Sequence, residues 1–346
     1  MKSEKSKQRL QKIKEFFKKY PVIITLAVIL PVSIYTLAYF VRTETYYYHY
    51  YYDGEYYQID ADEFKLTGIK KVANVYQAAS AFSYQGGACY EEYYAVVTDN
   101  FEAVIVYNTK ENMKVEHVID TNISNTYWHC NQMFFGPDYF SVHDKFPILY
   151  ISMEHPDVNA LMGFRIYQLG GEYFIKKISQ FTLYFDDGKG PIYYPNAYYD
   201  FESKLLYYVG YTKKSYYQEA DNYLRYYAFT MPDYRTEMDG WFTSQAEETF
   251  ELPSETACQG GCILDHYLYQ TFSFASKTDP IKAPKMKVID LVNHEIVYDN
   301  QNLGAEFGVY QEFEHIAINS DGKMYSLGNP FNIYEFTWTD ESPDSI

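Results

Sequence analysis

The sequence predicts an all-β fold, a β-propeller, preceded by one N-terminal transmembrane helix. Three observations predict it. An uncharged apolar stretch occupies residues 21–41, short strand-like runs divided by turn residues fill the chain that follows, and the order of these runs recurs in units of about 40–65 residues.

The apolar stretch reads PVIITLAVILPVSIYTLAYFV. It can span a bilayer, because a helix rises about 1.5 Å per residue and the hydrocarbon core is about 30 Å thick. Residues 2–19 before it hold eight Lys or Arg and two Glu, a net charge of +6. The positive-inside rule therefore places residues 1–20 in the cytoplasm as a basic tail, and all that follows the helix outside the cell membrane. A cleaved signal peptide would need a shorter apolar core and a small-residue cleavage site, and neither is present.

The exported part and the tail differ in the sign of their net charge. The chain of 346 residues has a formal charge of −17, so the part beyond the basic tail carries −23. Such an acidic surface repels phosphate backbones, which excludes nucleic acid as a partner. Aromatic residues make up 20% of the chain, with 42 Tyr, and these residues favour half-buried strands.

The exported part divides by composition into three segments. Residues 42–63 form a Tyr-rich juxtamembrane segment, residues 64–340 the propeller, and residues 341–346 a C-terminal tail. No stretch here has helical periodicity. The strand-like runs include residues 93–98, 103–107, 148–152, 164–168, 205–209, 223–229, 266–272, 285–290, 315–318 and 323–327.

Internal repeats indicate the propeller. The triplet QGG at residues 85–87 and again at 259–261 precedes three strand-like runs each time, and weaker copies begin at His129, Asn196 and Glu312. Three or four strands in each unit is the content of one propeller blade.

The blade count has two solutions. Five units fill the domain, and residues 64–84 then supply a strand that closes the ring with the C-terminus. A sixth blade follows instead if residues 43–80 form a blade of their own.

The order of four short motifs carries a resemblance. They are QGG at 85–87, HCN at 129–131, a second QGG at 259–261, and EFEH at 312–315 before a DGKMY strand. This order is similar to that of a family of uncharacterised, largely bacterial cell-envelope five-bladed propellers with QGG, H-x-N, QGG and E-P-E-G-like motifs. The fourth motif departs from the pattern, with Phe313 in place of Pro and His315 in place of Gly. The resemblance implies a fold and no reaction, because propellers host both binding and catalysis.

The first polar residues of each innermost strand are expected to face one funnel at the propeller axis. They suit a polar pocket for a sugar, a peptide or an ion. The alternative is that they bond to neighbouring blades and hold the ring closed. The seven candidates are Gln85, His129, Asn131, Asn196, Gln259, Glu312 and Glu314.

Two of these candidates are acids that share one face of a strand, Glu312 and Glu314. Glycosidase chemistry would need a third acid opposite them, and Asp200 is the sequence's one candidate. Because the first inner strand, at residues 82–85, has no acid, this reading is disfavoured. We see no metal-binding spacing and expect no cofactor.

The four cysteines all lie in the exported part, where disulfides are permitted. Cys89 and Cys130 begin consecutive units and could join two blades. Cys258 and Cys262 flank the second QGG and could clip that turn. Buried free thiols are the remaining alternative, since sequence does not fix connectivity.

The leading expectation for function is a non-catalytic binding or scaffold module for a glycan, a peptide or another envelope partner. The second is an exported hydrolase or lyase acting on saccharides through the funnel. The third is a structural part of a membrane complex, which would expose an apolar patch.

Overall fold

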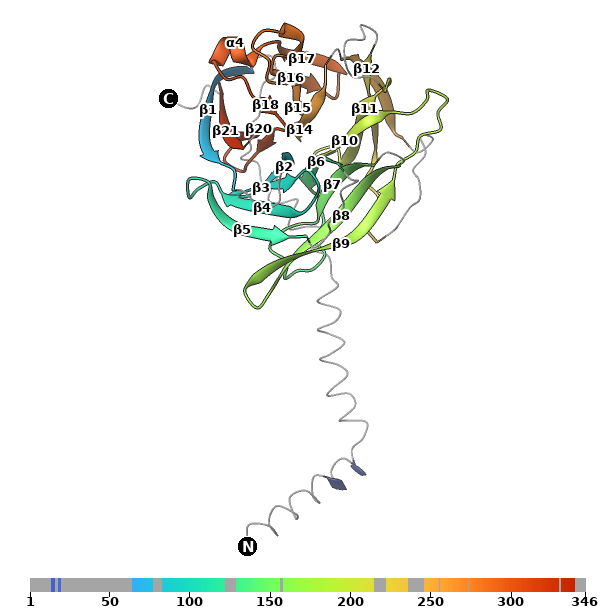
Figure 1. Ribbon diagram of the computed structural model, residues 1–346. Coiled ribbons are helices and arrows are strands. Elements are labelled where there is room, and N and C mark those ends of the chain that lie inside the picture. Colours follow the sequence, from blue (N-terminus) through green and yellow to red (C-terminus); the bar gives the residue numbers. More distant parts are fainter. Residues whose placement is uncertain are drawn as a thin grey trace.

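The strand-like runs form five antiparallel sheets arranged as a ring in the computed structural model (Figure 1). An all-β, five-bladed propeller is therefore confirmed. The structure describes residues 14–15, 18–19, 64–76, 83–121, 129–155, 158–214, 222–235, 246–254, 256–272, 274–329 and 331–339.

The first four sheets each contain four strands in chain order, running from the axis to the rim. The first blade comprises β2 (Tyr84–Tyr90), β3 (Tyr93–Thr98), β4 (Ala103–Asn108) and β5 (Lys114–Asp120). The second comprises β6 (His129–Phe135), β7 (Leu149–His155), β8 (Val158–Leu169) and β9 (Glu172–Thr182). The third comprises β10 (Tyr193–Asp200), β11 (Leu205–Tyr211), β12 (Tyr223–Thr230) and β13 (Glu248–Pro253). The fourth comprises β14 (Cys258–Leu264), β15 (Tyr267–Phe272), β16 (Lys285–Asp290) and β17 (Glu295–Asn300).

The fifth blade joins the two ends of the propeller. Its strands are β18 (Glu312–Phe313), β19 (Ala317–Ile318), β20 (Met324–Asn329), β21 (Asn332–Thr339) and β1 (Lys65–Asn74). β1 pairs antiparallel with β21 from Lys65 opposite Thr339 to Asn74 opposite Asn332. The expected closing strand is thus confirmed. The six-bladed alternative is wrong, because β1 belongs to this sheet and not to a blade of its own.

Two short helical segments lie beside the sheets, the 3₁₀-helix η3 (Pro280–Lys282) and the α-helix α4 (Leu303–Phe307). The Asn302 side chain caps α4 by accepting a hydrogen bond from the Ala305 N–H, and the chain leaves at Gly308 with φ of 72°. The sequence predicts no helix here, because five residues are too few to show periodicity.

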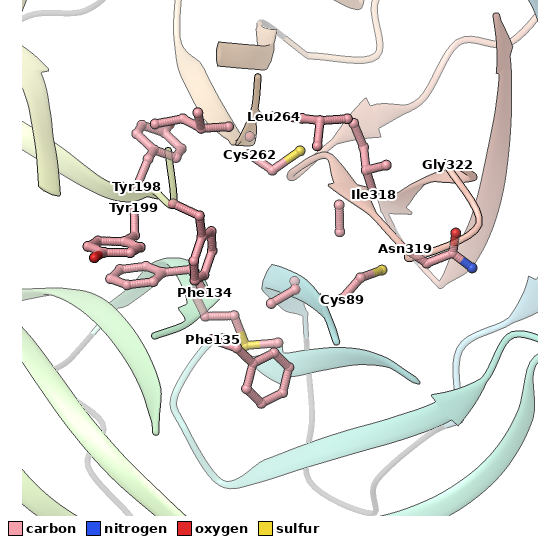
Figure 2. Close-up of a pocket in the computed structure, with 17 residues that line it drawn as sticks. Cys89, Phe134, Phe135, Tyr198, Tyr199, Cys262, Leu264, Ile318, Asn319 and Gly322 are labelled. Carbon is pink, nitrogen blue, oxygen red and sulfur yellow. The ribbon is translucent and has the colours of Figure 1, made fainter. Parts of the chain in front are cut away.

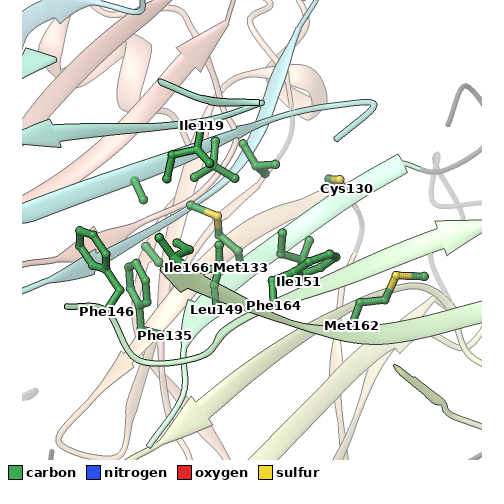
Figure 3. Packing of buried hydrophobic residues seen from close by; sticks show 14 of the residues in the cluster. Ile119, Cys130, Met133, Phe135, Phe146, Leu149, Ile151, Met162, Phe164 and Ile166 are labelled. Atoms are coloured by element: carbon green, nitrogen blue, oxygen red, sulfur yellow. The ribbon is translucent and has the colours of Figure 1, made fainter. Parts of the chain in front are cut away.

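Apolar side chains fill the space between neighbouring blades. Five buried clusters each join two adjacent sheets of the described residues, so every blade is held by both neighbours. Figure 3 shows the cluster between the first and second blades, with Ile119 facing Met133, Phe135 and Phe164. The largest fully buried side chains are all tyrosines: Tyr84, Tyr94, Tyr107, Tyr150, Tyr198, Tyr208, Tyr211, Tyr226, Tyr227, Tyr269 and Tyr325.

The predicted membrane segment at residues 21–41 lies outside the described residues, as do residues 42–63 and 341–346. In the part of the chain that the structure describes, no helix combines the length and the apolar character needed to cross a bilayer.

Candidate functional site in the propeller funnel

A cavity of about 210 Å³ lies where the inner strands begin, at one end of the propeller axis. The structure brings all seven sequence-predicted residues to its wall, and all five blades contribute. These residues are Gln85 from β2, His129 and Asn131 from β6, Asn196 from β10, Gln259 from β14, Glu312 from β18, and Glu314 just after it.

Irregular pairing aims these side chains at the axis. The inner strands of the first four blades have register shifts, between Tyr84 and Gly87, Cys130 and Gln132, Tyr193 and Asn196, and Cys258 and Gly260. Gln85, Asn131 and Gln259 lie within these shifts. In the fifth blade, the inner strand breaks between β18 and β19, and Glu314 lies in the break. An extra residue in one strand bends it and redirects its side chains, which explains why these polar groups converge.

His129 and Asp99 form an ion pair at the cavity wall. The His129 Nδ1 lies 2.5 Å from Asp99 Oδ1, and the Ser83 hydroxyl donates to Asp99 Oδ2 over 3.0 Å. Burial acts to lower the pKa of His129, but the bond and charge of Asp99, with the charge of Glu154, raise it overall. Burial alone would raise the pKa of Asp99. The hydrogen bond and charge of His129, with the hydrogen bond from Ser83, outweigh burial and lower this pKa overall. The exposed imidazole keeps Nε2 to offer to a ligand.

Two neighbouring acids lie on the fifth blade. Gln259 Nε2 donates to Glu312 Oε1 over 2.8 Å, and the Asn329 amide donates to Glu314 in a short hydrogen bond. Burial raises the pKa of Glu312, and Gln259 offsets this only in part. Burial and the charges of Glu312 and Asp99 raise the pKa of Glu314 well above its usual range. These carboxyls therefore stay protonated to higher pH than exposed ones.

A third acid lines the cavity that is not among the seven sequence-predicted residues. Glu154 lies near the end of β7, the second strand of its blade, and lines the same cavity. Burial raises its pKa, and His129, Asn131 and Lys214 offset this in part. The prediction from sequence rests on the inner strands alone, so it does not include a residue of β7. Glu154 is paired directly opposite His129, and this pairing brings it to the same wall.

Asp200, the acid that the sequence suggested for this role, does not line the cavity. It ends β10, where it accepts hydrogen bonds from the Glu202 N–H over 3.1 Å and the Ser203 hydroxyl over 2.6 Å. It therefore shapes the turn between β10 and β11, and the expectation of Asp200 as the third funnel acid is wrong.

The amides both join blades and face the cavity. Asn131 Nδ2 donates to the Pro195 carbonyl over 3.1 Å, and Asn196 Nδ2 to the Gln259 carbonyl over 3.2 Å. Asn196 is buried, and its Oδ1 has no hydrogen-bond partner in the described structure. An unpaired buried acceptor is costly, so Asn196 is where a ligand donor would gain most. Aromatic side chains complete the wall: Tyr194, Tyr211 and Phe274.

Gln132 and His315 close the floor of the funnel. The Gln132 amide donates to the carbonyls of Gly261 over 2.7 Å and Gly87 over 3.4 Å, so it joins three blades at the axis. Neither residue was among the seven candidates, and both bond to neighbouring blades at the axis. The glycines are needed here, since a Cβ on Gly260 would lie 2.4 Å from Gln132 Oε1.

The packing of this floor explains why the fourth motif has His315 in place of Gly. The His315 ring is fully buried, with Nδ1 2.9 Å from the Gln85 carbonyl oxygen and Nε2 2.7 Å from the Tyr94 hydroxyl. Burial lowers the pKa of His315 to about 3. A Cβ on Gly87 would lie 1.9 Å from this ring. His315 is therefore a neutral, structural residue that fills the space above Gly87.

A second pocket, of about 60 Å³, lies beyond this floor, where the inner strands end (Figure 2). Its wall is apolar and aromatic, and the thiols of Cys89 and Cys262 face it. All four cysteines, including Cys130 and Cys258, are free. The bridges that the sequence left open are therefore absent, and the alternative of free thiols holds.

The described residues contain no group of three or more His, Cys, Asp or Glu placed to hold a metal ion. A polar cavity with carboxyls, amides and aromatic walls can bind a small ligand rich in hydroxyl or amino groups.

No family model matches the chain, and no curated protein is similar to it. Similar solved structures include a glucose dehydrogenase, with 9% identity, a TM-score of 0.45, and coverage of 78% of this chain and 99% of that one. The PQQ-bound aldose sugar dehydrogenase of Streptomyces coelicolor has 9% identity, a TM-score of 0.47 and coverage of 80% and 99%. The exo-β-1,3-galactanase of Phanerochaete chrysosporium has 10% identity, a TM-score of 0.47 and coverage of 81% and 65%. Likeness this distant carries no argument about function.

Proposed function

We propose that this chain is a membrane-anchored, extracytoplasmic propeller that binds an envelope saccharide in its funnel. The observation that carries the proposal is the convergence of seven polar side chains from five blades on one cavity. Carboxyls and amides can bond to hydroxyl groups, and aromatic rings such as Tyr194 and Phe274 can pack against the apolar faces of sugar rings. The anchor and its orientation rest on the sequence of residues 1–41.

Thermal unfolding of the full chain against a panel of envelope saccharides tests this proposal. A ligand that binds only the folded state raises the unfolding midpoint. We expect at least one saccharide to raise it, and His129→Ala and Glu312→Ala to abolish the shift. The matched control Glu295→Gln, an exposed acid on β17, should leave the shift unchanged. A shift that survives both funnel variants would place binding elsewhere, and no shift with any saccharide would contradict the proposal.

A saccharide hydrolase or lyase is the second candidate, and Glu154 favours it. This acid and Glu312 line one cavity from different blades, and burial raises both pKa values. A protonated and an ionised carboxyl on two sides of a glycosidic bond could supply acid and base. Product analysis after incubation with the stabilising saccharide separates the candidates. Cleavage that Glu154→Gln and Glu312→Gln each abolish would establish an enzyme, and intact saccharide would establish a binder.

A further inference from the structure

We propose that the funnel selects a saccharide carrying a free, protonated amino group over its neutral N-acetylated counterpart. This inference rests on the proposed saccharide site and deepens it by naming the charge of the ligand. It is carried by the charges that line the cavity and by one unpaired acceptor among them.

The cavity is lined by acids without basic residues to match them. Glu154, Glu312 and Glu314 face it, and its wall contains no Lys or Arg among the described residues. Its one basic side chain, His129, is bound to Asp99, so that pair adds no net charge. Lys214 acts on Glu154 only as a nearby charge and is not part of the wall. A cation entering the cavity would therefore meet carboxyl groups whose charge, once they ionise, no basic residue of the wall compensates.

The state of the three acids supports this reading. Burial raises the pKa of each one, and the charge of Glu312 adds to the effect on Glu314. An ammonium group placed among them would favour their ionised forms. Binding of an amine would then release protons, whereas binding of a neutral sugar would not.

A second observation points to a donor-rich ligand. Asn196 is 3% exposed, lines the cavity, and has an Oδ1 without a partner in the described structure. An ammonium group has three donors and no acceptor, so it can bond to carboxylate oxygens and to such an amide oxygen together. An N-acetyl group presents one N–H and brings a carbonyl oxygen toward the carboxylates instead.

The test is calorimetric titration of the full chain with glucosamine oligosaccharides and with fully N-acetylated oligosaccharides of the same length. We expect the amine form to bind at least tenfold more tightly at neutral pH. Its affinity should rise with pH as the funnel acids ionise, fall again at the pH where the ammonium group loses its proton, and fall with added salt. Titration in buffers of different ionisation enthalpy should show proton release for the amine form alone.

Variants of the funnel acids test whether these residues cause the preference for the amine. Glu154→Gln and Glu312→Gln should each reduce the preference for the amine severalfold, while Glu295→Gln should leave it unchanged. Equal or tighter binding of the N-acetylated form, still sensitive to His129→Ala, would overturn the amine inference and leave the saccharide site standing. Absence of binding by either form and by every saccharide of the thermal panel would overturn both.

Discussion

At the scale of the residue, the polar side chains near the propeller axis have two roles. Some bond to neighbouring blades, and others line the funnel cavity. Gln132 and His315 have their hydrogen-bonding atoms used by neighbouring blades, and both are buried. His129 and Glu312 line an open cavity and retain groups that a ligand can reach, and the buried Asn196 keeps one unpaired amide oxygen at the cavity wall. The sequence could not separate the two kinds, because both are polar residues near the start of an inner strand.

The packing of Gly87 against His315 gives a testable expectation. Gly87→Ala should lower the free energy of unfolding by about 3 kcal/mol, because its Cβ would overlap the imidazole in a fully packed site. The double variant Gly87→Ala with His315→Ala should be more stable than the sum of the two single effects predicts. Chemical denaturation of the four proteins measures this coupling.

Gly68 on β1 provides the matched control, since a Cβ there would have its nearest neighbour at 3.7 Å. Gly68→Ala should change stability by no more than about 1 kcal/mol. Strictly additive effects of Gly87→Ala and His315→Ala would contradict the packing described for this floor.

At the scale of the element, the breaks in the inner strands create the site. Register shifts at residues 84–87, 130–132, 193–196 and 258–260 place polar groups at the axis. The strand positions could be predicted from alternation and turn residues, and β3 and β16 have the predicted bounds. The shifts could not, because they depend on pairing with the next strand. Glu154 was missed for a related reason, since it reaches the funnel from β7.

Ring closure by β1 and β21 can be tested with an engineered disulfide. Lys70 and Glu335 are directly opposite each other, as are Lys287 and Asp299 within the fourth blade. Cysteine at Lys70 and Glu335 would close a loop of roughly 270 residues, against roughly 12 for the other pair, and the longer loop should add about 3 kcal/mol more stability.

Thermal unfolding of both variants, oxidised and reduced, makes the measurement. The Lys70 and Glu335 pair should raise the midpoint more, and only when oxidised. An equal or smaller gain than that of the Lys287 and Asp299 pair would show that β1 does not close the ring as described.

At the scale of the whole molecule, burial of ionisable groups at the axis ties stability to pH in two opposite ways. His315 has its pKa lowered to about 3, so the stability it contributes is complete above the usual His value and is lost as pH falls. Glu314 has its pKa raised, so the folded state holds a proton that the unfolded chain releases. Its contribution is present at low pH and is lost as pH rises through the raised value.

Glu314→Gln isolates the second effect. The stability of the natural protein relative to this variant should fall as pH rises from about 5 to about 8, by at most about 1.4 kcal/mol per pH unit. Denaturation midpoints across this range measure it. A rising difference for Glu314→Gln would mean that its carboxyl is ionised when folded.

The architecture of the whole molecule was the most predictable level. Repetition of the units that begin with Gln85 and Gln259 specifies blades, and the run at residues 64–84 specifies the closing strand. The convergence of the funnel side chains followed from the same logic. The charge balance of the cavity could not be predicted, since it depends on Asp99 pairing with His129 and on Asp200 turning away.

The most direct test of the central claim is a crystal structure of the protein with the saccharide that raises its unfolding midpoint most. The account predicts ligand density in the funnel, within hydrogen-bonding distance of Asn196 and Glu312. Density in the opposite pocket beside Cys89 and Cys262, or only on the outer faces of the blades, would contradict it.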